Sequence, residues 1–426
     1  MPGHKGVTFL GPENMDITEI CGADVLYSPD GIIEESENNA SLLFGSDHTY
    51  YSAEGSTLAI KAMLRLATED FVSPLILAAR NVHKSFINAC ALLDIDVKWI
   101  VSKNRDHLCS CNITPEELES SLDSCPEKPC AVYVTSPDYM GNILDISAIS
   151  EVCHRHGIPL LVDNAHGAYL AFTKPSMHPL SLGADICCDS AHKTLPVLTG
   201  GAYLHVSKSA PPRFANRSSV RSALSLFAST SPSYLILQSL DVCNKYLSDG
   251  YRSRLGAHIR AISDLKETLT SFGYTVLPSE PLKIVIDCNK YGYKGSEISG
   301  FLRENRIECE FSDDQYTVLM TTPENSEPEL NELISTLLKL KARPAVIPFS
   351  SGALSIEPRS VISIREAILS RHETVRVDDA EGRICAAPSV SCPPAVPIAV
   401  SGEVISRDHI ALFKEYGIDE IEICIK

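Results

Sequence analysis

Short apolar runs and amphipathic stretches alternate between about residue 55 and residue 206 of this chain. The runs "SPLILAAR", "DVKWIV", "PCAVYVTSP" and "IPLLVD" are apolar along almost their whole length, which is typical of strands buried on both faces. The stretches "STLAIKAMLRLA", "HKSFINACALLD" and "ISAISEVCHRHG" carry apolar residues at helical spacing. The alternation predicts an α/β fold with a mainly parallel sheet that helices cover on both sides.

The pattern changes after about residue 245. A helix ("RLGAHIRAISDLKETLTSFG"), a strand ("LKIVIDC"), a second helix ("SEISGFLREN") and a strand pair predict a smaller α+β domain. A linker-like stretch, "KARPAVIPFSSGALSIEPRS", then leads into a Pro-rich appendage that contains Pro393, Pro394 and Pro397 and ends in "EIEICIK". We therefore expect four parts: an N-terminal segment (1–50), a large domain (51–245), a small domain (246–345) and a C-terminal region (346–426).

Polar residues gather where the predicted strands of the large domain end. They occupy positions 80–83, 136–137, 163–166 and 190–193. Ligands of such sheets bind beyond the carboxyl ends of the strands, so these positions predict a binding site.

Lys193 raises a specific chemical question, because it lies between two apolar runs in "DICCDSAHKTLPVLTGGAYLHV". A buried ammonium without a partner is costly, so a nearby carboxylate would have to pair with it. Alternatively the lysine is bound as an imine to a carbonyl cofactor. A third reading is a loop lysine whose amine reaches solvent.

The chain also holds candidates for the other parts of a pyridoxal phosphate site. Asp163 ends a predicted strand, where it could face a pyridine nitrogen or cap the next turn. Gly55, Ser56 and Thr57 begin a predicted helix and could bind a phosphate or act as an ordinary cap. His83 begins another helix and could stack on the cofactor ring, although capping is the commoner role of such a histidine.

Composition limits the classes of function. The chain of 426 residues has a formal net charge of −17, which argues against a nucleic-acid or anionic-membrane surface. Its longest apolar runs have strand length, and "MPGHKGVTFLGPENMD" lacks the core of a signal peptide, so we expect a cytoplasmic protein that does not bind a membrane. The fifteen cysteines are scattered and lack C-x-x-C spacing, so we expect neither a disulfide framework nor a metal site.

Taken together, the motifs resemble those of the Orn/Lys/Arg decarboxylases, which are fold-type-I pyridoxal phosphate enzymes related to aspartate aminotransferase. The matching stretches are "PGHKG", "DITE", "SPDGIIEE", "GST", "RNVHKS", "TSPDYMG", "DNAHGAY", "SAHKTLPVLTGGA", "STSPSY" and "PPAVPIAVSGEVI". The resemblance runs almost from end to end and is to the short form that lacks the N-terminal wing domain.

The resemblance implies a role for each motif residue. Lys193 would hold pyridoxal 5′-phosphate covalently, Asp163 would hold the pyridine nitrogen, and His83 would stack on the ring. Gly55, Ser56, Thr57 and Ser190 would bind the cofactor phosphate. His192 would lie near the substrate Cα, and His166 would lie on the O3′ side of the ring. Thr230 and Ser231 would reach the cofactor phosphate of a neighbouring protomer. Glu403 is our candidate for a carboxylate near the distal cation of the substrate; the alternative is an exposed turn residue.

The implied function is decarboxylation of a basic amino acid, arginine ahead of lysine or ornithine, in polyamine biosynthesis. The resemblance also implies a homodimer or a higher homo-oligomer with a shared active site. The alternatives are another fold-type-I reaction, such as transamination or lyase chemistry, and a catalytically idle regulatory protein that binds the cofactor. Four positions depart from the family pattern and change the surroundings of the site: Glu54, Asn164, Gly200 and Ser401.

Overall fold

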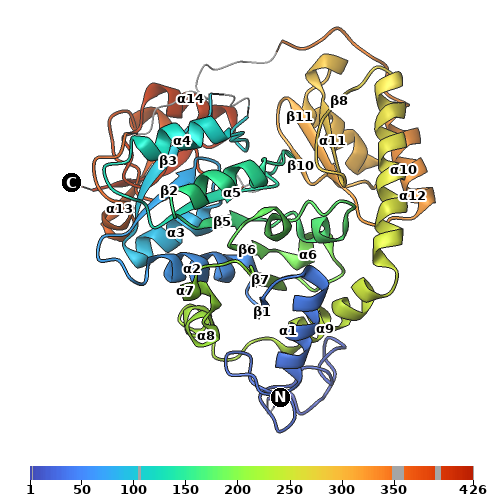
Figure 1. The fold of residues 1–426 in the computed structure, drawn as a ribbon. Helices are drawn as coiled ribbons and strands as arrows, with labels where there is room; N and C mark the ends of the chain where they lie inside the picture. Colours follow the sequence, from blue (N-terminus) through green and yellow to red (C-terminus); the bar gives the residue numbers. More distant parts are fainter. Residues whose placement is uncertain (2, 104–106, 348–358, 389–394, 426) are drawn as a thin grey trace.

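A seven-stranded sheet forms the centre of the computed structural model, which describes residues 1, 3–103, 107–347, 359–388 and 395–425 (Figure 1). From one edge to the other, its strands are β1 (His48–Ser52), β7 (Ala202–Val206), β6 (Ile186–Asp189), β5 (Leu160–Asp163), β4 (Ala131–Thr135), β2 (Leu75–Ala79) and β3 (Asp96–Ile100). The strands from β6 to β3 pair in parallel, and β7 runs antiparallel to both of its neighbours. The predicted mainly parallel sheet is confirmed.

Alternate residues of the central strands enter two different cores. Ile76, Ala78 and Tyr133 pack on one face, whereas Leu77 and Val132 pack on the other. The first face is covered by α2 (Gly55–Thr68), α3 (Lys84–Leu93), α7 (Pro212–Ala215) and α8 (Arg217–Ser225), and the second by α4 (Pro115–Asp123) and α5 (Ile146–Arg155). Burial of both faces explains why these strands read as continuous apolar runs.

The edge near β1 carries a third core, built from the N-terminal helix and the segment after β7. The helices α1 (Ile32–Phe44) and α9 (Tyr234–Ser248) pack together there, beside the short helix η1 (Ala168–Phe172). The short helix η2 (Pro179–Leu182) instead packs against α5. In Figure 1 the N-terminal segment lies beneath α1 and α9. The sequence pattern did not predict α1 or β1.

The small domain is an antiparallel sheet covered by helices. Its strands follow the order β10 (Phe311–Ser312), β11 (Tyr316–Met320), β9 (Lys283–Asp287) and β8 (Thr275–Leu277). Its helical elements are α10 (Tyr251–Ser271), η3 (Asn289–Tyr291), α11 (Gly295–Glu304) and α12 (Glu327–Leu337). This architecture agrees with the predicted α+β class, whereas the boundaries at residues 50, 245 and 345 stay predictions.

The C-terminal region contains more structure than a Pro-rich appendage. It holds α13 (Ile364–Leu369), β12 (His372–Arg376), η5 (Val377–Asp379), α14 (Arg407–Glu415) and β13 (Glu420–Cys424), and β12 pairs with β13. Ser363 and Glu366 form a capping box that starts α13, which packs against α3. Pro393, Pro394 and part of the linker-like stretch lie outside the described residues. Among the helices described, none is both long and apolar enough to cross a membrane.

Candidate active site

A cavity of about 330 Å³ opens at the carboxyl ends of the central strands. Nine of the predicted site residues line it: Gly55, Ser56, Thr57, His83, Asp163, His166, Ser190, His192 and Lys193. The other described lining residues are Asn81, Cys109, Thr135, Pro137, Tyr139, Ala165, Glu310, Ala395 and Val396. The topology thus brings together residues that are up to 341 positions apart in the sequence, from Gly55 to Val396.

Lys193 lies on the four-residue helix α6 (Ala191–Thr194), directly after β6. Its Nζ lies 3.0 Å from Nε2 of His166. Burial lowers the pKa of Lys193, and the negative charges of Asp163 and Glu310 oppose this effect only in part. Burial also lowers the pKa of His166 well below its usual range, and the charge of Lys193 adds to the shift. Burial therefore shifts both members of the pair towards their uncharged forms.

Asp163 is held rigidly at the end of β5. Its Oδ1 accepts a hydrogen bond of 3.1 Å from the backbone N–H of Ala165, and its Oδ2 accepts one of 3.2 Å from the Tyr133 hydroxyl. The side chain is 2 % exposed, and the residue lines the cavity. A buried carboxylate in this position suits a cationic ring nitrogen, whose charge would replace the missing solvent.

His83 is both a helix cap and a cavity residue. Its Nδ1 accepts a hydrogen bond of 3.1 Å from the backbone N–H of Ser85, which makes it the N-cap of α3. Acceptance at Nδ1 places the proton of the neutral ring on Nε2. The two alternatives for this histidine are therefore compatible, because capping fixes the ring that lines the cavity.

The turn before α2 has the features of an anion site. Gly55 has φ +70°, and its N–H donates to the Gly200 carbonyl at 2.7 Å. Glu54, the N-cap of α2, makes no side-chain capping bond, so the first N–H groups of α2 have no cap. The Ser190 hydroxyl donates to Ser56 Oγ at 2.8 Å. Hydroxyls and N–H groups of this kind bind phosphate oxygens.

Gly200 itself is required by the backbone. Its φ is +96°, and an added Cβ would lie 3.0 Å from the carbonyl oxygen of Ala53. Gly200 is one of the four positions that depart from the family pattern. Because it has no Cβ, its backbone can lie close to Ala53, where its carbonyl accepts the hydrogen bond from the Gly55 N–H.

His192 presents one ring nitrogen to the site. Its Nδ1 lies 3.1 Å from the Gly201 carbonyl, to which it donates, so Nε2 is the acceptor of the neutral ring. Burial lowers the pKa of His192, which favours that neutral form.

Several buried polar atoms of the lining residues have no partner within the part of the chain described. They are Oδ1 of Asn81, Oγ1 of Thr135 and Nδ1 of His166. Buried polar atoms normally make hydrogen bonds, so a polar ligand fits this cavity. Together with the Asp163 carboxylate, the Lys193 amine and the anion site at α2, these atoms fit pyridoxal phosphate.

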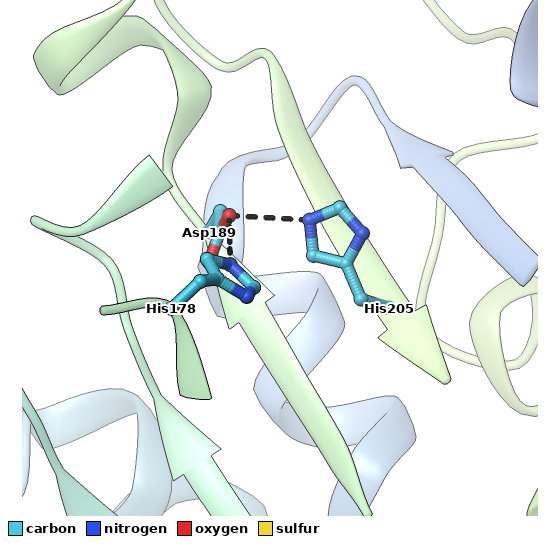
Figure 2. Close-up of side chains that lie close together, drawn as sticks. All are labelled: His178, Asp189 and His205. Carbon is cyan, nitrogen blue, oxygen red and sulfur yellow. Dashed lines mark hydrogen bonds and ion pairs between the residues drawn. The ribbon is translucent and has the colours of Figure 1, made fainter. Parts of the chain in front are cut away.

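A buried cluster of hydrogen-bonded side chains lies under the ends of β5 and β6. Figure 2 shows the rings of His178 and His205 converging on Asp189, whose Oδ2 lies 3.0 Å and 3.1 Å from their Nε2 atoms. Burial would raise the pKa of Asp189, but the charges and hydrogen bonds of the two histidines outweigh it and lower the pKa. Asn164 donates to Oδ1 of the same carboxylate at 2.6 Å. Asn164 thus ties the strand end that carries Asp163 to the strand end that carries Ser190.

Within the described residues, these three side chains (His178, Asp189 and His205) are also the group that could hold a metal ion. Their potential ligand atoms lie within 4.8 Å of one another. Both imidazoles, however, contact the same carboxylate oxygen at hydrogen-bond distance. We therefore describe it as a hydrogen-bonded cluster rather than a metal site.

Three predicted residues do not line the cavity of their own chain. Thr230 and Ser231 are exposed, and the N–H of the preceding Ser229 donates to Glu54 at 2.6 Å. Glu403 is fully buried, and its carboxylate lies 3.1 Å from the Arg80 guanidinium. Arg80 thus neutralises the carboxylate that we had expected near the substrate cation, and Glu403 is not an exposed turn residue either.

Sequence reasoning missed several lining residues. Tyr139 stands in the quoted stretch "TSPDYMG", so its position after β4 was a usable signal. Glu310 comes from the small domain and carries no motif, and Ala395 reaches the site because its carbonyl accepts the Lys84 N–H at 3.0 Å. Such long-range contacts leave no local pattern in the sequence.

Comparison with known proteins decides the family. The family model for the Orn/Lys/Arg decarboxylase major domain matches residues 4–284, and the model for the C-terminal domain of the same family matches residues 353–416. The chain belongs to the Orn/Lys/Arg decarboxylase family. The matched regions include every described lining residue of the cavity except Glu310, and they include both Arg80 and Glu403.

Similar proteins are known for this Orn/Lys/Arg decarboxylase along nearly its whole length. An arginine decarboxylase of Halalkalibacterium halodurans is 29% identical, covering 97% of this chain and 89% of that protein. An arginine decarboxylase of Bacillus subtilis is also 29% identical with the same coverage, and the uncharacterized protein YaaO of that organism is 30% identical over 93% of this chain and 84% of its own.

Solved structures support the fold of this decarboxylase. The lysine decarboxylase of Francisella novicida superposes with a TM-score of 0.81 at 17% identity, covering 100% of this chain and 78% of that one. The constitutive lysine decarboxylase of E. coli gives a TM-score of 0.79 at 15% identity, with 100% and 79% coverage. The predicted fold class and family are therefore confirmed.

Proposed function

We propose that this decarboxylase uses pyridoxal phosphate to remove carbon dioxide from a basic amino acid, with arginine ahead of lysine and ornithine. The observation that carries the proposal is Lys193, which lies partly buried at the carboxyl ends of the strands in one cavity with Asp163. The relatives named arginine decarboxylases support the choice of arginine.

The residues of the cavity would hold the cofactor as follows. Lys193 would attach it covalently, and Asp163 would pair with the pyridine nitrogen. His83 would lie flat on the ring, with His166 on its O3′ side, while Ser56, Thr57, Ser190 and the N–H groups of α2 would bind the phosphate. When bound, pyridoxal phosphate supplies a cationic ring that accepts the electron pair released at Cα as carbon dioxide leaves.

The lowered pKa values suit Lys193 to act as a nucleophile and suit both Lys193 and His192 to transfer a proton. A lowered pKa increases the fraction of Lys193 present as the uncharged, nucleophilic amine. His192 or Lys193 would deliver the proton that Cα needs after carbon dioxide has left.

The test is product analysis. The cofactor-loaded protein is incubated separately with arginine, lysine and ornithine, and amine, carbon dioxide and keto acid are measured. We expect equimolar amine and carbon dioxide, fastest from arginine. Keto acid without carbon dioxide would indicate transamination, and no product from any amino acid with cofactor bound would indicate an idle binding protein.

We also propose that the protein is a homodimer in which Thr230 and Ser231 reach the cofactor phosphate of the partner. Exposed apolar side chains on the N-terminal segment support an interface: Phe9 is 78 % and Leu10 is 90 % exposed. Leu42 on α1 and Val242 on α9 are exposed as well, and those two helices pack together.

A shared phosphate site would link dimerisation to cofactor binding, because each favours the same assembled state. Sedimentation across a dilution series should then show that removing the cofactor weakens the dimer. Thr230→Ala should weaken both dimer and cofactor binding, whereas Ser225→Ala, also exposed, should weaken neither. Equal dimer dissociation constants with and without cofactor would contradict the shared site.

The proposed compartment is the cytoplasm, and the proposed process is polyamine biosynthesis. The fourteen described cysteines are free thiols, most of them buried, which suits a reducing compartment.

A further inference from the structure

One carboxylate that lines the cavity has no role in the proposed function. Among the described lining residues the acidic side chains are Asp163 and Glu310, and the lysine is Lys193. In the proposed function Asp163 pairs with the pyridine nitrogen and Lys193 holds the cofactor. Glu310 then has no role, although a basic amino acid brings a distal cation into the same cavity.

Glu310 is well placed and held in position. It directly precedes β10, and its N–H donates to the Val318 carbonyl at 3.0 Å. The Tyr139 hydroxyl donates to its Oε1 at 2.8 Å, and the Tyr139 ring meets the His166 ring edge to face at 5.0 Å. A carboxylate has about four acceptor sites, so the Tyr139 bond leaves acceptors for a second donor.

The negative charge of Glu310 acts on groups inside the cavity. It raises the pKa of Lys193 against the larger effect of burial, so its field reaches the amine where substrate chemistry takes place. The residue is only partly buried, so a ligand cation can reach it without full desolvation of the pair. Glu403, by contrast, is neutralised by Arg80.

We propose that Glu310 binds the distal guanidinium or ammonium group of the substrate and thereby selects basic amino acids. The inference rests on the proposed function, because it assigns the reacting end of the substrate to Lys193. It places substrate selection on the small domain, while the reacting end is held by the large domain. A charge-assisted hydrogen bond of this kind discriminates strongly against a substrate that lacks the cation.

Glu310→Gln tests the proposal, since the amide keeps the size of the side chain and can still accept the Tyr139 bond. We expect kcat/KM for arginine to fall by about 10- to 100-fold, mainly through KM. For citrulline, which replaces the guanidinium by a neutral urea, the variant and the wild type should differ little. Glu308→Gln is the control, because Glu308 is exposed and pairs with Arg303.

Binding provides a second readout that does not need turnover. Calorimetric titration of the cofactor-loaded protein with the amine product of arginine should show a weaker Kd for Glu310→Gln by a similar factor, with the visible absorbance of the bound cofactor unchanged. An unchanged Kd and an unchanged ratio of arginine to citrulline would overturn the proposal. If the wild type binds the product amine but releases no carbon dioxide, the proposed function fails and the titration still decides the role of Glu310.

Discussion

At the scale of the residue, the site depends on groups whose ionisation is set by burial. Lys193, His166 and His192 have pKa values lowered mainly by desolvation, so each favours its neutral form. Asp163 is more deeply buried than Lys193 and His192, and it accepts hydrogen bonds from Ala165 and Tyr133. Burial thus acts on the bases of the site, while hydrogen bonds hold the Asp163 side chain in place.

Asp163→Asn should keep the fold and lose most of the activity. An amide preserves the hydrogen-bond geometry but cannot stabilise a cationic ring nitrogen, so kcat should fall by about two orders of magnitude or more. Steady-state kinetics with the cofactor concentration saturating separates this loss from weaker cofactor binding. A variant that retains most of its kcat with cofactor bound would assign Asp163 a different role.

Nine of the eighteen described lining residues of the cavity were predicted, because polar residues at strand ends have a local signature. Glu403 could not be placed in this way. Its partner Arg80 lies 323 positions earlier in the chain, and no local pattern reveals that the two meet. Glu310 was missed for the same reason.

At the scale of the element, the buried Arg80–Glu403 salt bridge holds the C-terminal region against the large domain. Arg80 follows β2 and also donates to the carbonyl groups of Pro397 and Ile398, at 3.3 Å each. The neighbouring Ala395 and Val396 line the cavity. The pair therefore connects the stability of this region to the shape of the site.

Glu403→Gln should destabilise the protein, because it leaves the Arg80 charge buried without its partner. Removal of one member of a buried pair costs about 3–5 kcal/mol. Glu381→Gln is the matched control, since the Arg407–Glu381 pair is exposed and worth about 0–1 kcal/mol. Urea unfolding of the two variants measures the difference. Equal losses would show that Arg80 finds another partner.

The elements that the sequence predicted best were the strands buried on both faces, since their composition alone marks them. The strand β1 reads "HTYYS", a mixed edge sequence, and was not predicted. The strands β12 and β13 form a two-stranded sheet and are partly exposed, and their position beside a Pro-rich stretch concealed them in the sequence. Elements whose stability comes from distant partners are weakly encoded in local pattern.

At the scale of the whole molecule, buried neutral histidines predict how stability changes with pH. Burial lowers the pKa of His83, His166, His192, His205, His258 and His409, the last to about 4. The unfolded chain takes up protons at these positions near the ordinary value of 6.5, whereas the folded chain does so only at lower pH. The free energy of unfolding should therefore fall as pH drops below about 6.5, by up to about 1.4 kcal/mol per pH unit for each proton that the folded state does not bind.

His107 acts in the opposite direction but in a different range. Burial lowers its pKa, yet the neighbouring Cys109, followed by the hydrogen bond and charge of Asp313, raises it to about 10. Its stabilisation is complete below pH 6.5 and is lost as pH rises toward 10, so it does not mask the acid effect. Urea unfolding at several pH values measures the slope, and His258→Gln should reduce it by up to one proton. A slope that this variant leaves unchanged would contradict the assignment.

The central claim is that Lys193 holds the cofactor and that the activity depends on this attachment. Borohydride reduction of the cofactor-loaded protein, followed by peptide mapping, tests it most directly. We expect the label on the peptide that contains Lys193, in proportion to the activity lost, and neither label nor activity in Lys193→Ala. A label on another lysine, such as Lys283, which is fully buried and paired with Glu280 at 2.9 Å, would contradict the account.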